Sequence, residues 1–228
     1  MVYIHGAGYD HSVWLPFMPW LSRHDHAVLA IDLPGHGLSK SPPLASIEAM
    51  AQWVLALLDA TQVQEAALVG HSMGSLVALE LAASHPERVT HLALLGTAAP
   101  MAVSDELLTA ARHDEARAQA MIHTWSQGNR RDTPPPPAMS AAPGVLYADL
   151  VACDAYMHAQ AAAAKVGCPA LLMIGAADKM TSPRNAQRFA SHFKDARCVT
   201  LPDCGHAMLT ECPEALLAAL RNFIAPDQ

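Results

Sequence analysis

The sequence predicts an α/β fold in which a mostly parallel sheet is flanked by helices. Short apolar runs alternate with segments of helical length along the 228 residues, an order typical of strand–helix–strand units. Several of these runs are continuously apolar, as expected for parallel strands that are covered on both faces. We therefore expect six strands, at residues 2–4, 27–31, 66–69, 92–95, 170–174 and 198–201.

Helices are predicted between these strands, at residues 46–60, 75–84, 104–124, 184–193 and 213–224. The first of them has clear signals: Ser46 suits the N-cap position, and Met50, Val54 and Leu58 recur at helical spacing. Pro213 suits the first turn of the last helix, where its missing N–H costs nothing.

Composition excludes several classes of protein. The chain is 52% apolar and 15% charged, which rules out a disordered chain. Its net charge of −7 and the lack of a dense Lys/Arg run argue against nucleic acid as a partner. No apolar stretch reaches the roughly 18 residues of a membrane span, and the first residues do not resemble a signal peptide. The five cysteines include no Cys-x-x-Cys pair, so we expect reduced thiols and a cytoplasmic location.

The most informative motif is Gly70-His71-Ser72-Met73-Gly74, which lies between a predicted strand and a predicted helix. A Gly-x-Ser-x-Gly sequence in this context is typical of a nucleophile elbow. The serine occupies a strained turn, and small residues on either side let the strand and the helix approach each other. Ser72 is therefore the predicted nucleophile; the alternative is that it only caps the following helix.

A serine nucleophile needs a base, an acid and an oxyanion hole, and the sequence offers each at the end of a strand. His206 follows the late strand in a Gly-His pair, and Asp178 follows the strand at 170–174. The Gly-rich segment His5-Gly6-Ala7-Gly8 follows the first strand, where a backbone N–H can face a substrate oxygen. In a parallel sheet these carboxyl ends lie together. Asp203 and Asp154 are alternatives to Asp178 as the carboxylate that holds the imidazole. Asp203 is only three residues before His206, too close in sequence to present its carboxylate to the Nδ1 of that ring.

These motifs resemble those of the α/β-hydrolase superfamily, and in particular small bacterial serine esterases with a helical lid. The similarity runs from His5 to Glu211 and includes Asp32-Leu33-Pro34-Gly35-His36-Gly37-Leu38-Ser39 and His85-Pro86-Glu87-Arg88-Val89. It implies that Ser72 is the nucleophile, His206 the general base and Asp178 the group that orients the imidazole. It also implies an oxyanion hole formed by the N–H groups of Ala7 and Met73.

The resemblance implies no cofactor and no metal, and the histidines at positions 5, 36 and 71 match no metal-ligand spacing. Gly6 and Gly8 are expected to contact the substrate. Family members carry two further strands before the His-Gly motif, whereas four residues precede His5 here. We therefore expect the first two strands of the fold to be missing, with a late start of the reading frame as the favoured reason. The strand at 27–31 would then form a sheet edge, in a monomer or a homodimer.

The segment 101–165 is longer than an ordinary crossover, so it is predicted to be a helical lid on a core made of residues 1–100 and 166–228. Met121, Trp125 and Met157 are its candidate substrate-binding residues, although such side chains also serve as plain packing. The predicted function is hydrolysis of a carboxylic ester of a small to medium acyl group through an acyl-enzyme. The alternatives are a related reaction on a thioester, an enol-lactone or a C–C bond, or a non-catalytic binding protein.

Overall fold

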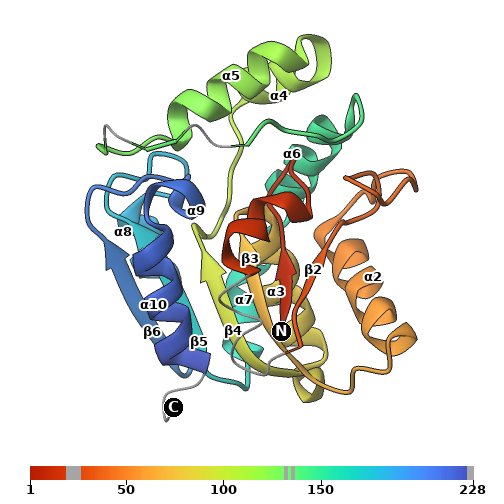
Figure 1. Ribbon diagram of the computed structural model, residues 1–228, viewed down its shortest axis with the longest axis vertical. Helices are drawn as coiled ribbons and strands as arrows, with labels where there is room; N and C mark the ends of the chain where they lie inside the picture. Colours follow the sequence, from red (N-terminus) through yellow and green to blue (C-terminus); the bar gives the residue numbers. More distant parts are fainter. Residues whose placement is uncertain (19–26, 131–132, 135–136, 225–228) are drawn as a thin grey trace.

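The computed structural model describes residues 1–18, 27–130, 133–134 and 137–224. Six strands form one parallel sheet in the order β2-β1-β3-β4-β5-β6 (Figure 1). Their bounds are β1 Val2–Ile4, β2 Leu29–Ile31, β3 Ala66–His71, β4 Val89–Leu95, β5 Ala170–Gly175 and β6 Ala196–Leu201. All six predicted strands are present, and β2 lies at the sheet edge, as expected for the strand at 27–31.

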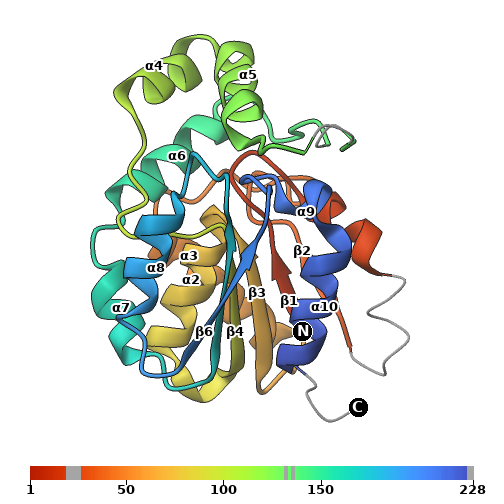
Figure 2. The ribbon, with the colours of Figure 1, turned by 90° about the vertical axis from the view of Figure 1, so that its left-hand side faces the viewer.

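Helices cover both faces of the sheet (Figure 2). On one face lie α2 (Ile47–Ala60), α3 (Met73–Ser84), α7 (Ala159–Lys165) and α8 (Pro183–Ala190). On the other lie the 3-10 helix η1 (His11–Phe17), α9 (Met208–Glu211) and α10 (Pro213–Ile224). A short 3-10 helix, η3 (Pro86–Arg88), leads into β4. The two apolar layers explain why the strands are apolar without alternation.

A third apolar cluster lies beyond the carboxyl ends of the strands, at the top of Figure 1. It joins α4 (Asp105–His113), α5 (Glu115–Ser126) and α6 (Val145–Ala155). Within the segment predicted as a lid, these three helices pack on one another, and α6 also joins the main helical layer through Ala152 and Cys153. Helix α7 differs from them, because its alanines pack in the main helical layer beside α3.

The prediction of one helix at 104–124 was wrong, because the chain breaks at Asp114. This residue has an extended φ of −151°, and its side chain accepts the backbone N–H of Arg117, which caps α5. The cap therefore ends one helix and begins the next. Helices α6 and α7 lie within the segment 101–165, which was predicted to be helical as a whole, but neither was predicted individually. The helices expected near 46–60 and 213–224 are confirmed within one residue.

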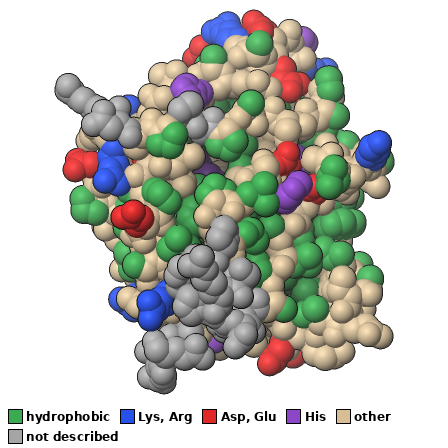
Figure 3. Space-filling view, viewed as in Figure 1, with side chains coloured by type: hydrophobic (Ala, Val, Ile, Leu, Met, Phe, Trp, Pro, Cys, Tyr) green, Lys and Arg blue, Asp and Glu red, His purple; other side chains and the backbone are tan. Residues whose placement is uncertain are grey.

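Charged side chains are scattered over the surface shown in Figure 3, where Lys and Arg do not gather in one patch. Among the described residues, no helix combines the length and the apolar character needed to cross a membrane.

Candidate active site

Ser72 lies in the sharp turn between β3 and α3, and its backbone is in the left-handed region with φ of +52°. Such a φ is unfavourable for a residue with a side chain and is tolerated only where the surroundings impose it. A Cβ on Gly70 would lie 2.1 Å from the carbonyl oxygen of Gly74, and a Cβ on Gly74 would lie 2.3 Å from that of Ile4. The two glycines are therefore required by backbone packing, as the motif predicted.

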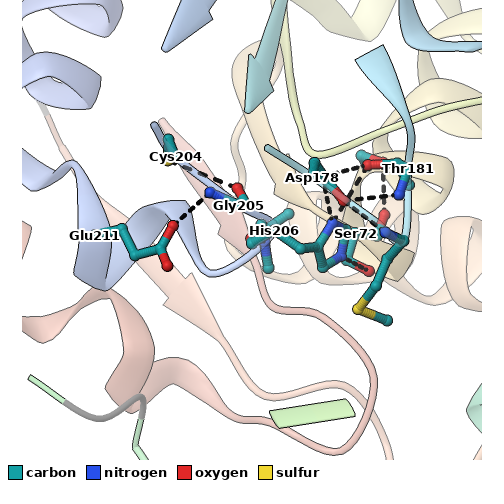
Figure 4. Close-up of polar contacts among 10 residues, drawn as sticks. Ser72, Asp178, Thr181, Cys204, Gly205, His206 and Glu211 are labelled. Carbon is teal, nitrogen blue, oxygen red and sulfur yellow. Dashed lines mark hydrogen bonds and ion pairs between the residues drawn. The ribbon is translucent and has the colours of Figure 1, made fainter. Parts of the chain in front are cut away.

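The structure brings Ser72, His206 and Asp178 into one hydrogen-bonded chain (Figure 4). The Ser72 Oγ lies 2.9 Å from the Nε2 of His206, and the Nδ1 of His206 lies 2.8 Å from the Oδ2 of Asp178. Asp178 and His206 are each 4% exposed, whereas Ser72 is half-buried and open to a cavity. This geometry can pass the serine proton to the imidazole while the carboxylate fixes the ring tautomer.

Asp178 is held by a tight turn that sequence reasoning did not identify. Its Oδ1 accepts the backbone N–H groups of Met180 and Thr181, each at 2.8 Å, and its Oδ2 accepts the Thr181 hydroxyl at 2.7 Å. Burial alone would raise the pKa of Asp178, but the charge of His206 and these hydrogen bonds hold it below its usual value. A Thr three residues after an Asp at a strand end is the signal that could have pointed to this turn.

His71, next to the nucleophile, is hydrogen-bonded to the loop that carries His206. Its Nε2 donates a hydrogen bond to the backbone carbonyl of His206 at 2.9 Å, and the two rings lie 5.1 Å apart. Burial lowers the pKa of His71 to about 3, and the charge of His206 adds to this effect. His71 is therefore neutral at physiological pH.

The two backbone N–H groups predicted to form an oxyanion hole belong to Ala7 and Met73. Met73 is the first residue of α3, where a helix offers no acceptor to the N–H group. The N–H of Ala7 makes no hydrogen bond within the described residues, and Ala7 and Gly6 line the cavity beside Ser72. Gly8 does not line it, which corrects the expectation that it contacts substrate. Its N–H instead donates to Asp149 at 2.9 Å, and its carbonyl accepts from Ser140 at 3.1 Å.

The cavity has a volume of about 520 Å³ and extends from Ser72 to the helices beyond the strand ends. Trp125 lines it, as do Ile122 and Leu150. Among the described residues that line it, Lys179 is the only Lys, Arg, Asp or Glu. These residues are Gly6, Ala7, Tyr9, Val13, His71, Ser72, Met101, Ala102, Val103, Ser104, Leu107, Ile122, Trp125, Ser126, Pro137, Leu150, Cys153, Lys179, Met180, Thr181, His206, Ala207, Leu209 and Thr210.

Besides Gly8, two of the predicted substrate-binding residues do not line this cavity, and both come from the segment predicted as a lid. Met157 follows the end of α6 and is 71% exposed, so it faces solvent. Met121 packs against the cluster formed by α4, α5 and α6 and does not line the cavity, although Trp125, four positions further along α5, does. Helical spacing alone did not show which face of α5 turns toward Ser72.

Asp10, His11 and Asp32 bring three potential metal-ligand atoms within 4.8 Å of one another. Their carboxylates are already used as acceptors: Asp32 binds the N–H groups of His11 and Leu38, and Asp10 binds that of Ser12. The cluster is therefore explained by the turns that it holds.

Comparison with known proteins agrees with this geometry. The chain matches the alpha/beta hydrolase family over residues 1–220. It is 31% identical to a pimeloyl-[acyl-carrier protein] methyl ester esterase from Neisseria meningitidis serogroup C, over 97% of this chain and 91% of that one. Among solved structures, an enol-lactonase from Burkholderia xenovorans LB400 has a TM-score of 0.84 and 27% identity, covering 98% of this chain and 90% of that one. A hydrolase from Pseudomonas aeruginosa PA01 has a TM-score of 0.87 and 28% identity, covering 98% and 89%. The chain belongs to the α/β-hydrolase family.

Proposed function

We propose that this protein is a serine hydrolase that cleaves carboxylic esters of small to medium acyl groups through an acyl-enzyme. The observation that carries the proposal is the pair of distances that link Ser72 to His206 and His206 to Asp178. An esterase relative at 31% identity over nearly the whole chain supports the same reaction.

In the proposed mechanism, the Nε2 of His206 takes the proton of Ser72 as its Oγ attacks the acyl carbon. The N–H groups of Ala7 and Met73 bind the resulting oxyanion, and Asp178 stabilises the imidazolium. His206 then gives the proton to the departing alcohol, leaving the acyl group on Ser72. Water, deprotonated by His206, attacks this acyl-enzyme and releases the acid. No cofactor or metal has a part in these steps.

The cavity supports an apolar acyl group as the substrate. Most of its lining is apolar, and its volume of about 520 Å³ suits a small molecule. The segment 101–165 would act as the lid, because its helices α4 to α6 supply Leu107, Ile122, Trp125 and Leu150 to the cavity wall. The relative's name specifies a methyl ester, so a small alcohol leaving group is part of the proposal.

A lactone substrate is the second candidate. It is favoured by the 27% identity and the TM-score of 0.84 to an enol-lactonase. Opening of a lactone uses the same steps, except that the leaving alcohol stays attached to the acyl group.

Labelling with a fluorophosphonate probe tests the nucleophile. The wild type and Ser84→Ala, a control at the other end of α3, should be labelled, whereas Ser72→Ala should not. Ser72→Ala should also lose ester turnover by roughly 10³-fold or more while it stays folded. A folded Ser72→Ala variant with most of its activity would exclude the proposal.

A substrate panel separates the reaction classes. It comprises methyl and p-nitrophenyl esters, acyl thioesters, lactones and a C–C bond substrate, compared by kcat/KM. A higher kcat/KM for lactones than for open esters would favour the lactone as the substrate. A protein that the probe labels but that turns over no ester would exclude ester hydrolysis.

The cellular setting is also a proposal. The five cysteines form no disulfide, which is typical of the cytoplasm. The partner is a small-molecule ester, with neither nucleic acid nor membrane involved, and the protein acts as a monomer or a homodimer.

A further inference from the structure

Asp149 is a buried charge that the proposed reaction does not use. It lies on α6 among apolar residues and is 0% exposed. Its Oδ2 accepts the backbone N–H of Gly8 at 2.9 Å and lies 2.8 Å from the Nε2 of His36. Its Oδ1 makes no hydrogen bond within the described residues. Burying a carboxylate is costly unless a counter-charge compensates it, so the arrangement needs an explanation.

The hydrogen-bond geometry makes His36 the counter-charge. One ring nitrogen faces the Asp149 carboxylate, and the other, Nδ1, lies 3.2 Å from the carbonyl oxygen of Pro34. Both neighbours are acceptors, so both nitrogens must carry a proton. Burial lowers the pKa of His36, but the hydrogen bond and charge of Asp149 outweigh this and raise it above its usual value.

The neighbouring His5, whose ring lies 4.6 Å from that of His36, has the opposite state. Its Nε2 accepts the backbone N–H of Leu33 at 3.1 Å, and its Nδ1 donates to the carbonyl of Gly6 at 2.9 Å. A ring that accepts through one nitrogen and donates through the other is neutral. His5 therefore carries no charge that could pair with Asp149, and the ion pair joins Asp149 to His36.

This ion pair holds the loop that carries one half of the oxyanion hole. Gly8 follows Ala7 directly, and its φ of +72° gives the loop a sharp turn. Four hydrogen bonds tie the loop to the 140–149 segment. Gly8 donates to Asp149, Ser140 and Ala141 both donate their N–H groups to the carbonyl of Gly8, and the Ser140 hydroxyl donates to Asp10. The next residue on α6, Leu150, lines the cavity.

We propose that Asp149, with protonated His36 as its counter-ion, is a positioning residue that couples helix α6 to the oxyanion hole. The carboxylate fixes Gly8 and thereby the direction of the Ala7 N–H. The acyl group that packs against α6 would then influence how well the oxyanion is bound. The inference rests on the proposed function, because it assumes that Ser72 attacks a carbonyl.

The test combines kinetics with a tetrahedral mimic. Asp149→Ala should lower kcat for a p-nitrophenyl ester by roughly 10- to 100-fold, less than loss of a whole oxyanion donor, with KM within about twofold. Affinity for a trifluoromethyl ketone, which adds reversibly to Ser72, should fall by the same factor. Affinity for the matching alcohol, which cannot form the adduct, should not change.

If Asp149→Ala does not fold, the same measurements are made on Asp149→Asn and His36→Gln. Asp149→Asn keeps an oxygen acceptor for the Gly8 N–H, so it should lose less activity than the other two. Asp154→Asn is the matched control, because this α6 carboxylate accepts the N–H of Val103 and does not touch the 6–10 loop. It should leave the ketone affinity unchanged. Fluorophosphonate labelling carried to completion gives the fraction of each variant whose Ser72 is reactive, and kcat is expressed per labelled site.

Wild-type kcat and ketone affinity in folded Asp149→Ala, or an equal loss in Asp154→Asn, would overturn the inference. A wild type that is neither labelled nor active on esters would instead overturn the proposed function.

Discussion

Glu211 binds the backbone N–H of Gly205, the residue directly before His206 (Figure 4). Its other carboxylate oxygen accepts the N–H of Gly128 at 2.7 Å, just beyond the end of α5. The side chain is only 4% exposed. The two glycine backbones are in close contact, since a Cβ on either would lie 2.4 Å from the amide nitrogen of the other. One buried carboxylate thus joins the end of α5 to the loop that carries His206.

Replacing Glu211 with Gln should therefore weaken both the fold and turnover. The amide keeps one acceptor oxygen but turns a donor toward the other N–H, leaving a buried group unpaired at a cost of about 1–3 kcal/mol. We expect a lower free energy of unfolding by urea and a lower kcat per labelled site. Glu214→Gln, an exposed neighbour in the first turn of α10, should change neither by a comparable amount. Equal effects of the two substitutions would contradict this role.

The acid should be Asp178 and not Asp203. Asp178→Asn removes the acceptor that orients the Nδ1–H of His206, so kcat should fall by roughly 10³- to 10⁴-fold. Asp203 is exposed and has a positive φ of 57°, which Asn also tolerates. Asp203→Asn should therefore change kcat by less than about threefold. Turnover of p-nitrophenyl butyrate decides between them, and the reverse ranking would show that the wrong carboxylate was chosen.

The parts of the site that the sequence predicts are those that depend on neighbouring residues. The Gly70–Gly74 motif has a steric cause within five residues, and strand ends place Asp178 and His206 at one edge of the sheet. The fold class followed in the same way, since apolar runs and helical segments alternate along the chain.

The parts that escaped prediction depend on contacts between distant residues. Asp149 meets Gly8 across 141 positions, and Glu211 meets Gly128 across 83. No local pattern marks such pairs, because a carboxylate in a helix is usually a solvated side chain. The break at Asp114 was missed for a different reason: an Asp that caps a helix looks the same in sequence as one inside it.

Two buried histidines with lowered pKa values should make the protein less stable in acid. His71 has a pKa of about 3 and His5 of about 4 in the fold, whereas an unfolded histidine has about 6.5. Between these values the unfolded chain takes up protons that the folded chain does not, so the free energy of unfolding should fall as pH drops below about 6.5. His36 acts in the opposite direction. Its pKa is raised in the fold, so its contribution to the free energy of unfolding is present at low pH and is lost as the pH rises through that raised pKa.

His71→Gln isolates one of these contributions, because Gln can still donate to the carbonyl of His206. Each titrating group adds a slope of up to about 1.4 kcal/mol per pH unit, so the variant should lose less stability than wild type between pH 6.5 and 4.5. Urea unfolding at several pH values measures this. His113→Gln, an exposed histidine on α4, should keep the wild-type slope. Parallel slopes in wild type and His71→Gln would refute the assignment of a neutral buried His71.

Chain-length preference should respond to Trp125 and not to Met157. Trp125 lines the cavity, so Trp125→Ala should enlarge it and move the optimum of kcat/KM toward longer acyl chains in a C2 to C12 series of p-nitrophenyl esters. Ile122→Trp, on the same face of α5, should move the optimum toward shorter chains. Met157 is 71% exposed, so Met157→Ala should keep the wild-type profile. Turnover should persist in all three variants, because the triad residues Ser72, His206 and Asp178 and their hydrogen bonds are unchanged. A profile that shifts with Met157 but not with Trp125 would mean that the acyl group binds outside this cavity.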